Sequence, residues 1–179
     1  MLKFSQLAVV AALAATFGAA QAGPVVASST SATALATAIA GSGITISNAT
    51  LSLASSTAAG TFTGGASTVG FDRGVVLTTG TVDCIPGPNS SGSCGENSGA
   101  LTSLKFDFTS ATGEVFFQYV FGSEEYNEYV NQGFNDVFEL LLNGTNIALL
   151  QSSGEVVSID NVNCGVNSAY YRNNSSNNA

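Results

Sequence analysis

Five carboxylates gather between residues 121 and 139 of a chain that is otherwise poor in charge, and no Lys or Arg lies among them. Like charges this close repel one another, and burial would add a desolvation cost, so a bound cation would remove both penalties. Oxygen ligands without any histidine suit Ca²⁺ better than zinc or copper. We therefore expect a calcium site whose ligands are Glu124, Glu125, Glu128, Asn135 and Asp136.

The same segment has interpretations that need no metal. Its spacing is not that of an EF-hand loop. It could be a solvated acidic loop, or its glutamates could accept hydrogen bonds from backbone amides around Ser123. The aromatic side chains of Tyr126, Tyr129, Tyr170 and Tyr171 could stack on sugars, but ordinary packing along strands is the favoured interpretation.

Glycoside hydrolysis is the enzymatic alternative. It needs two carboxyl groups that face each other across a gap of about 5–9.5 Å. Adjacent strand residues point to opposite faces, so Glu124 and Glu125 cannot form the pair together, although either could act with Asp136. The chain contains no histidine, which removes the usual base of a nucleophilic triad. We therefore expect that the chain is not an enzyme.

Short β-strand patterns surround the acidic segment. Residues 114–121 carry so many aromatic and β-branched side chains that they predict a central strand, and a second strand is expected over residues 136–142. Leu104, Phe106 and Phe108 alternate with Lys105 and Asp107. Further strands are expected around residues 44–53, 74–80, 147–150 and 156–159, with a hairpin turn at residues 143–144.

These patterns predict an all-β fold, an antiparallel β-sandwich or jelly-roll-like domain with one short N-terminal helix. The helix is expected over residues 31–40, where alanine-rich sequence follows Ser31 and ends at Gly41. The sandwich domain is predicted to span residues 31–172, after a polar leader at 23–30 and before a disordered tail at 173–179.

Composition excludes some classes of partner. The chain has 179 residues, of which 9% are charged, with 4 Lys and Arg against 12 Asp and Glu. Such a chain would be repelled by phosphate backbones, so we expect no nucleic-acid partner. Glycans or extracellular matrix are the expected partners instead.

The N-terminus has the pattern of an export signal. Lys3 precedes an apolar run over residues 7–17, and small residues flank Gln21 before Gly23. We predict a signal peptide at residues 1–22, cleaved between Ala22 and Gly23. The apolar run is too short to span a membrane, and no second one follows, so no membrane span is expected in the mature chain. The chain is therefore expected to be extracellular or on the cell surface.

The chain has three cysteines, and export makes a disulfide possible. Cys84 and Cys94 flank a turn-rich stretch, which favours a bridge between them over free or zinc-binding thiols, because thiolate zinc sites use closer spacing and more ligands. Cys164 is left without a predicted partner.

Several motifs resemble those of the choice-of-anchor L domain family. They are Tyr-Val-Phe-Gly-Ser-Glu-Glu-Tyr at 119–126, Phe-Asn-Asp-Val-Phe at 134–138, the glycine-bounded stretches at 59–65 and 74–80, Gly-Pro-Asn at 87–89, Ser-Ile-Asp-Asn-Val-Asn at 158–163, and the tyrosine pair at 170–171. The resemblance runs from about residue 34 to residue 174.

The resemblance implies an exported bacterial β-sandwich module whose relatives carry varied C-terminal sorting signals, including the exosortase-processed kind. It supplies no catalytic residues. Recurrent acidic positions of the family would fall on Glu124, Glu125 and Asp136, which adds to the calcium prediction. It also implies further strands and an Asp-rich segment after residue 171, so the domain is expected to be incomplete.

The expected function is a non-catalytic secreted or cell-surface module, stabilised by calcium, for adhesion or for interaction with glycans or a biofilm matrix. Two alternatives stay open. One is a carbohydrate-active hydrolase that uses Glu124 or Glu125 with Asp136, and the other is a purely structural matrix protein.

Overall fold

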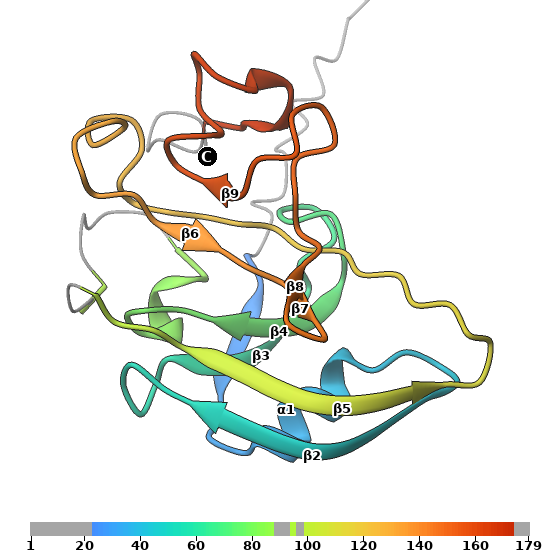
Figure 1. Cartoon of the computed structure of the whole chain (residues 1–179). Coiled ribbons are helices and arrows are strands. Elements are labelled where there is room, and N and C mark those ends of the chain that lie inside the picture. Colours follow the sequence, from blue (N-terminus) through green and yellow to red (C-terminus); the bar gives the residue numbers. More distant parts are fainter. Residues whose placement is uncertain (1–22, 88–93, 96–98, 174–179) are drawn as a thin grey trace, which may run out of the picture.

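The computed structural model describes residues 23–87, 94–95 and 99–173 (Figure 1). The predicted signal peptide and residues 174–179 of the predicted tail lie outside the described residues. The elements are β1 (Val25–Ser28), α1 (Ala32–Ile39), β2 (Ile44–Ser52), β3 (Ala59–Thr63), β4 (Arg73–Leu77), the 3-10 helix η1 (Val82–Cys84), β5 (Ser103–Ser110), β6 (Val137–Phe138), β7 (Leu141–Leu142), β8 (Thr145–Asn146), β9 (Val157–Ser158) and the 3-10 helix η2 (Ser168–Tyr170).

All the strand pairs among the described residues are antiparallel, which confirms the all-β prediction. In the described part of the chain the strands form one three-stranded sheet, in the order β1-β3-β4, and three two-stranded sheets, β2-β5, β6-β9 and β7-β8. This arrangement does not confirm the finer prediction of a two-sheet sandwich. None of the described helices is long and apolar enough to cross a membrane.

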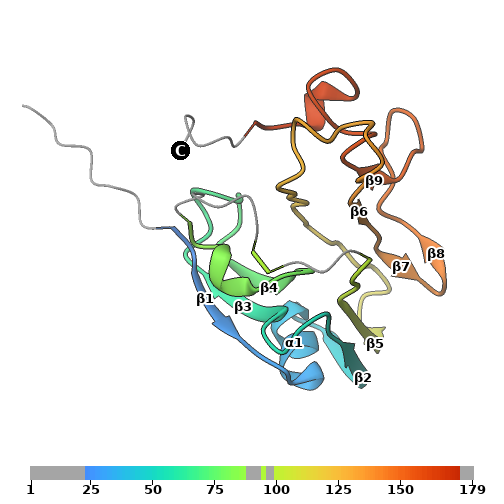
Figure 2. The same ribbon diagram turned by 90° about the vertical axis from the view of Figure 1, so that its left-hand side faces the viewer.

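The predicted N-terminal helix is confirmed as α1. The Ser31 hydroxyl caps it by accepting a hydrogen bond from the Ala34 N–H at 3.2 Å. Leu35 and Ala36 are fully buried. Figure 2 shows α1 between the three-stranded sheet and the β2–β5 pair, so its buried side chains join the two parts of this half of the molecule.

Residues 23–30, which were expected to be a polar leader, include the strand β1. Val25 and Val26 favour extended backbone, and β1 covers the free edge of β3 with the register Val25 to Thr63. Together with α1, the sheet encloses a core of small and apolar side chains, which comprises Leu35, Ala36, Ala58, Ala59, Phe62 and Val82.

The β2–β5 pair shows the predicted alternation. Leu104, Phe106 and Phe108 are partly buried on one face of β5, while Lys105 and Asp107 are exposed on the other. A bulge interrupts β2 between residues 47 and 50, and the side-chain amide of Asn48 there donates to the Asp107 carboxylate at 2.7 Å. The bulge interrupts the period-two alternation of β2, and the strand itself lies where it was predicted.

The C-terminal half contains a second, smaller core. Leu150, Val157 and Val162 are buried there, and Phe121, Phe138 and Tyr171 pack against them. The hairpin predicted at residues 143–144 is confirmed between β7 and β8, and both turn residues have positive φ, at 50° and 83°, as a type I′ turn requires.

The prediction of a central strand over residues 114–121 is wrong. The segment is extended, but none of the described strands pairs with it. Phe116 is 88% exposed and Val120 is 58% exposed. Side-chain type predicts extended backbone correctly here, whereas a strand in a sheet also needs a neighbour that shares its hydrogen bonds.

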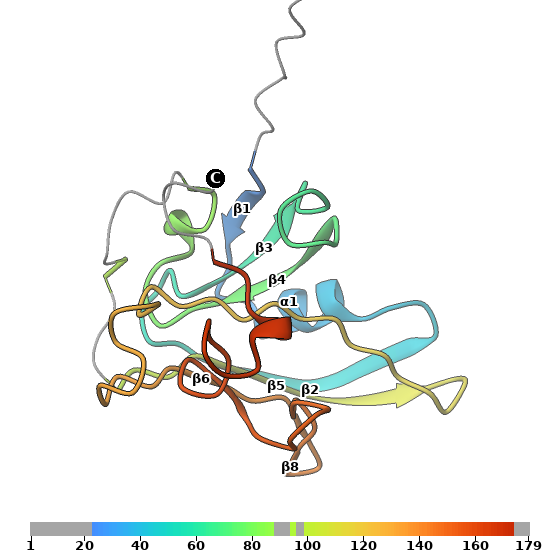
Figure 3. The same cartoon turned by 90° about the horizontal axis from the view of Figure 1, so that it is seen from above.

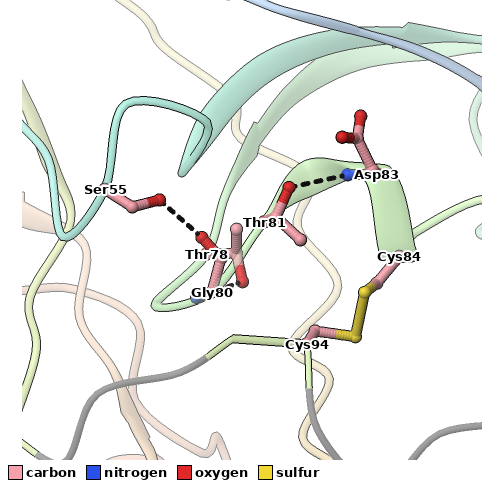
Figure 4. The surroundings of a disulfide bond; sticks show 7 residues. All are labelled: Ser55, Thr78, Gly80, Thr81, Asp83, Cys84 and Cys94. Atoms are coloured by element: carbon pink, nitrogen blue, oxygen red, sulfur yellow. Dashed lines mark hydrogen bonds between the residues drawn. A yellow bond between two sulfur atoms is a disulfide. The ribbon is translucent and has the colours of Figure 1, made fainter.

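The predicted disulfide between Cys84 and Cys94 is confirmed, with the two Cα atoms 6.0 Å apart (Figure 4). The backbone N–H of Thr81 donates to the Cys94 carbonyl at 3.0 Å beside it. The Thr81 hydroxyl accepts from the Asp83 N–H and so caps η1. Cys164 is a free, exposed thiol.

We expect the double variant Cys84→Ser/Cys94→Ser to lose roughly 2–3 kcal/mol of unfolding free energy, because the unfolded chain gains the entropy of an open loop. Urea denaturation of the oxidised protein and of the variant measures the difference. Cys164→Ser is the matched control and should unfold like the parent chain. Equal midpoints for the parent and the double variant would contradict a stabilising bridge.

Candidate functional site

Residues 123–136 form an acidic loop whose two ends are joined by a side-chain hydrogen bond. The Ser123 hydroxyl donates to the Asp136 carboxylate at 2.7 Å and accepts from the Glu125 N–H at 3.1 Å. Asp136 thus closes the loop. The hydrogen bond fixes the Asp136 carboxylate next to β6.

The acidic loop is held against residues 158–171, which we call the C-terminal segment (Figure 1). The Tyr126 hydroxyl donates to the Val162 carbonyl at 2.6 Å, and the Tyr171 hydroxyl donates to the Asn127 side chain at 2.7 Å. The rings of Tyr126 and Tyr171 also pack together, with centroids 5.0 Å apart. Two tyrosines from segments far apart in the sequence therefore fix one side of the loop.

Asp160 fixes the other side of the loop. Its carboxylate accepts from the Asn131 N–H at 2.5 Å, and its own N–H donates to the Asn135 side-chain oxygen at 3.1 Å. The Ile159 N–H donates to the Asp136 carbonyl at 3.2 Å. Asn135, predicted as a calcium ligand, is thus placed on the side of the loop that faces the C-terminal segment.

Asn163 holds the C-terminal segment itself in shape. Its side chain is 3% exposed. The amide donates to the carbonyls of Ile159 and Asp160, both at 3.0 Å, and its oxygen accepts from the N–H groups of Gly165 and Val166, both at 2.9 Å. One side chain therefore satisfies four backbone groups around the turn that receives the acidic loop.

The pKa of Tyr126 is raised from 10.0 to about 12, chiefly by burial and also by the neighbouring Tyr171 and Asp136, whose negative charges disfavour the phenolate. The neutral phenol is also the form that donates to the Val162 carbonyl. Tyr126 is therefore a neutral hydrogen-bond donor in the folded protein throughout the ordinary pH range.

We expect Tyr126→Phe to change how stability responds to alkaline pH. A pKa that is higher in the folded state means that stability from this group is fully present below pH 10 and is lost as pH rises from 10 towards about 12. The parent chain should therefore lose its advantage over the variant across that window. Thermal unfolding of both proteins at stepped pH measures this, and a constant difference through the window would contradict the assignment.

Three of the predicted ligands lie around one hollow of about 310 Å³, which we call the acidic hollow. It is lined by Glu124, Glu125, Glu128, Tyr129 and Phe134. The Tyr129 and Phe134 rings meet edge to face, with centroids 5.1 Å apart at 67°. The hollow thus combines carboxylates on one part of its wall with an aromatic pair on another.

The structure separates Asn135 and Asp136 from this hollow, which neither residue lines. Within residues 23–87, 94–95 and 99–173, no group of three or more Asp, Glu, His or Cys side chains gathers closely enough to hold a metal ion. The sequence analysis missed Phe134 as part of the wall. Its signal is an aromatic residue directly after Gly133 in a loop that is otherwise mostly polar.

The predicted catalytic pairs are not brought together across this hollow. Glu124 and Glu125 line it, whereas the Asp136 carboxylate is hydrogen-bonded to Ser123. Of the four tyrosines considered for sugar stacking, Tyr129 lies in the hollow, Tyr126 and Tyr171 hold the acidic loop, and Tyr170 is exposed elsewhere.

Antiparallel strands, a disulfide and a docked acidic loop define an all-β module. A family model described as the choice-of-anchor L domain matches residues 24–179, and the chain belongs to this family. The family is not an enzyme family, and membership implies a surface or exported protein. No curated protein and no solved structure matches the chain.

Proposed function

We propose that the chain is an exported surface module that binds saccharides in the acidic hollow. The observation that carries the proposal is the shared wall, in which two aromatic rings and three carboxylates border one space of about 310 Å³. That volume is at the lower end of the range for small-ligand sites, which combine apolar surface with a few convergent polar groups.

The chemistry of the wall favours one class of sugar. Carboxylates accept hydrogen bonds from hydroxyl groups, and an aromatic ring offers an apolar face to the C–H groups of a pyranose. The chain has a formal net charge of −8, so sugars that carry carboxylate or sulfate groups would be repelled. Neutral sugars and protonated amino sugars are the ligand class we propose.

Binding to three immobilised oligosaccharides tests the proposal: a neutral oligomer, its amino-sugar counterpart and a uronic-acid oligomer. We expect the first two to bind and the third not to bind. The double variant Tyr129→Ala/Phe134→Ala should bind at least about tenfold more weakly, because it removes the stacking surface. Tyr170→Ala, which removes an exposed tyrosine outside the hollow, is the matched control.

The same samples separate this proposal from its alternatives. Release of reducing ends from any of the oligomers would support a hydrolase and contradict a pure binding module. Absence of binding to every oligomer, with folded protein, would overturn the saccharide proposal and leave a structural matrix protein as the simplest account.

Calcium stays a prediction within this proposal. In its favour, three glutamates border one hollow, and residues 121–139 include no Lys or Arg. Against a pre-formed site, the described residues gather no cluster of three acidic groups, so water and carbonyl oxygens would have to complete the shell.

We expect calorimetric titration to detect Ca²⁺ binding that raises the thermal midpoint, since a ligand that binds only the folded state stabilises it. Glu124→Gln/Glu128→Gln should remove both effects, while Glu155→Gln, outside the acidic loop, should keep them. No heat of binding and no thermal shift in the parent chain would contradict the calcium prediction.

A further inference from the structure

Residues 115–122 form an extended segment with an unpaired backbone, which we call the open strand. Within the described residues, no backbone hydrogen bond joins it to another segment. It crosses the molecule as a plain coil in Figure 3, between β5 and the acidic loop. Backbone groups left in this state form a ready edge for pairing with another strand.

The side chains of the open strand already alternate as they do in a sheet. Phe117 and Phe121 are partly buried, and the Tyr119 ring packs on Phe138 with centroids 4.7 Å apart. Phe116 and Val120 point outward and are largely exposed. The segment thus has an inner face and an outer face, on which Phe116 and Val120 flank Gln118, and apolar side chains on both faces are typical of a strand with neighbours.

The open strand lacks the features that usually protect an edge. Residues 115–122 include no charged residue and no proline, and they form no bulge against a partner. Natural edges are normally blocked by such devices because otherwise they recruit another chain. Their absence indicates that this edge is covered in the working protein.

We propose that a second copy of this chain covers it, through antiparallel pairing of the two open strands about a two-fold axis at Gln118. A two-fold axis perpendicular to a sheet brings residues of the same face opposite each other. Residues on one face of a strand are an even number of positions apart, so the numbers of two paired residues must add to an even sum. The choice of centre then decides which side chains meet.

Centring the pair on Gln118 matches every apolar side chain with another. Phe117 faces Tyr119 and Val115 faces Phe121 on the inner face, Phe116 faces Val120 on the outer face, and Gln118 faces its symmetry mate. Each of the three apolar pairs occurs twice, and the Gln118 pair on the axis occurs once. Aromatic pairs and aromatic–β-branched pairs are among the cross-strand contacts that stabilise sheets most.

The neighbouring two-fold registers are worse. A centre at Phe117 places Phe116 opposite Gln118, and a centre at Tyr119 places Val120 opposite Gln118. Both leave an exposed apolar side chain against an amide. The Gln118 register also places the Glu114 residues at opposite ends of the ladder, so that like charges stay far apart.

Pairing would also cover part of the molecule's apolar surface. Val115, Phe116 and Phe117 border a cavity of about 250 Å³ together with side chains of β2 and β5. The dimer would carry two acidic hollows, so that one particle could bind a polymer at two points and gain affinity from the linkage. The inference does not depend on that gain, because it concerns the strand alone.

Sedimentation of the exported chain over a range of concentrations tests the proposal, with Cys164→Ser as background so that the exposed thiol cannot link two copies. We expect a monomer–dimer equilibrium. Gln118→Glu places two negative charges directly opposite each other, and Gln118→Lys does the same with positive charges. Each should raise the dissociation constant at least about tenfold.

An equimolar mixture of the two Gln118 variants should restore dimers, since opposite charges then face each other. Gln118 is exposed and takes part in no hydrogen bond in the described structure, so both variants should keep the monomer fold, which circular dichroism checks. Gln151→Glu and Gln151→Lys, at an exposed turn residue, carry the same charge changes as matched controls and should dimerise normally.

Three results would overturn the proposal. They are a monomer at every concentration, a dimer that neither Gln118 variant weakens, and an open series of oligomers larger than the dimer. As an independent readout, Gln118→Cys in the same background should form a disulfide-linked dimer on oxidation, because residues opposite each other on antiparallel strands have Cβ atoms about 4.5–5.5 Å apart.

Discussion

Gly60→Ala should destabilise the protein by roughly 3 kcal/mol, a large part of the stability of a small domain. Gly60 is buried in β3, the middle strand of the three-stranded sheet, between Ser28 of β1 and Val76 of β4. A Cβ atom here would lie 2.5 Å from the Ala27 carbonyl oxygen and 3.1 Å from its carbon.

The obstacle is backbone, so no side-chain rotation can relieve it. Either β1 moves away from β3 and loses ladder hydrogen bonds, or the sheet distorts around α1 and its buried residues. Urea denaturation measures the loss of unfolding free energy. Gly41→Ala is the matched control, because a Cβ there meets nothing within 4 Å. Equal losses for the two variants would contradict the packing described for β1.

Asn163→Ala should cost a similar amount, roughly 3 kcal/mol, and should also release the acidic loop. The substitution leaves two N–H groups and two carbonyls of the C-terminal segment without the side chain that pairs them. The turn that presents Val162 to Tyr126 would lose its shape, and the pKa of Tyr126 should fall back towards 10.0.

Two measurements check this prediction together. Thermal unfolding reports the loss of stability. Ultraviolet titration of the tyrosines reports whether the pKa of Tyr126 has fallen. Asn161→Ala in the same segment removes a single hydrogen bond, to the Val156 carbonyl, and should cost only about 1 kcal/mol. A smaller loss in Asn163→Ala than in this control would contradict the role of Asn163.

Local patterns predicted those parts of the fold that depend on neighbours in sequence. The alternation of Leu104, Phe106 and Phe108 predicted β5, the Asn-Gly pair predicted the β7–β8 turn, and Ser31 predicted the start of α1. The spacing of Cys84 and Cys94 predicted the bridge, because a short turn-rich loop lets the two residues meet.

Features that depend on distant partners were not predictable in this way. The composition of residues 114–121 indicates an extended conformation but carries no information about which segment lies beside it. Asn135 and Asp136 were predicted as metal ligands from their type, and their hydrogen bonds to Asp160 and Ser123 could not be foreseen from the sequence. Asn163 went unnoticed because a buried asparagine is recognised only when the four backbone groups around it are known.

The central claim is that the acidic hollow is the ligand-binding surface, and a two-dimensional NMR titration with the amino-sugar oligomer tests it most directly. The amides of Glu124, Glu128, Tyr129 and Phe134 should shift in proportion to occupancy, while those of β5, outside the hollow, should stay in place. Shifts confined to β5 or to other residues outside the hollow, or no shifts at saturating oligomer, would contradict the account.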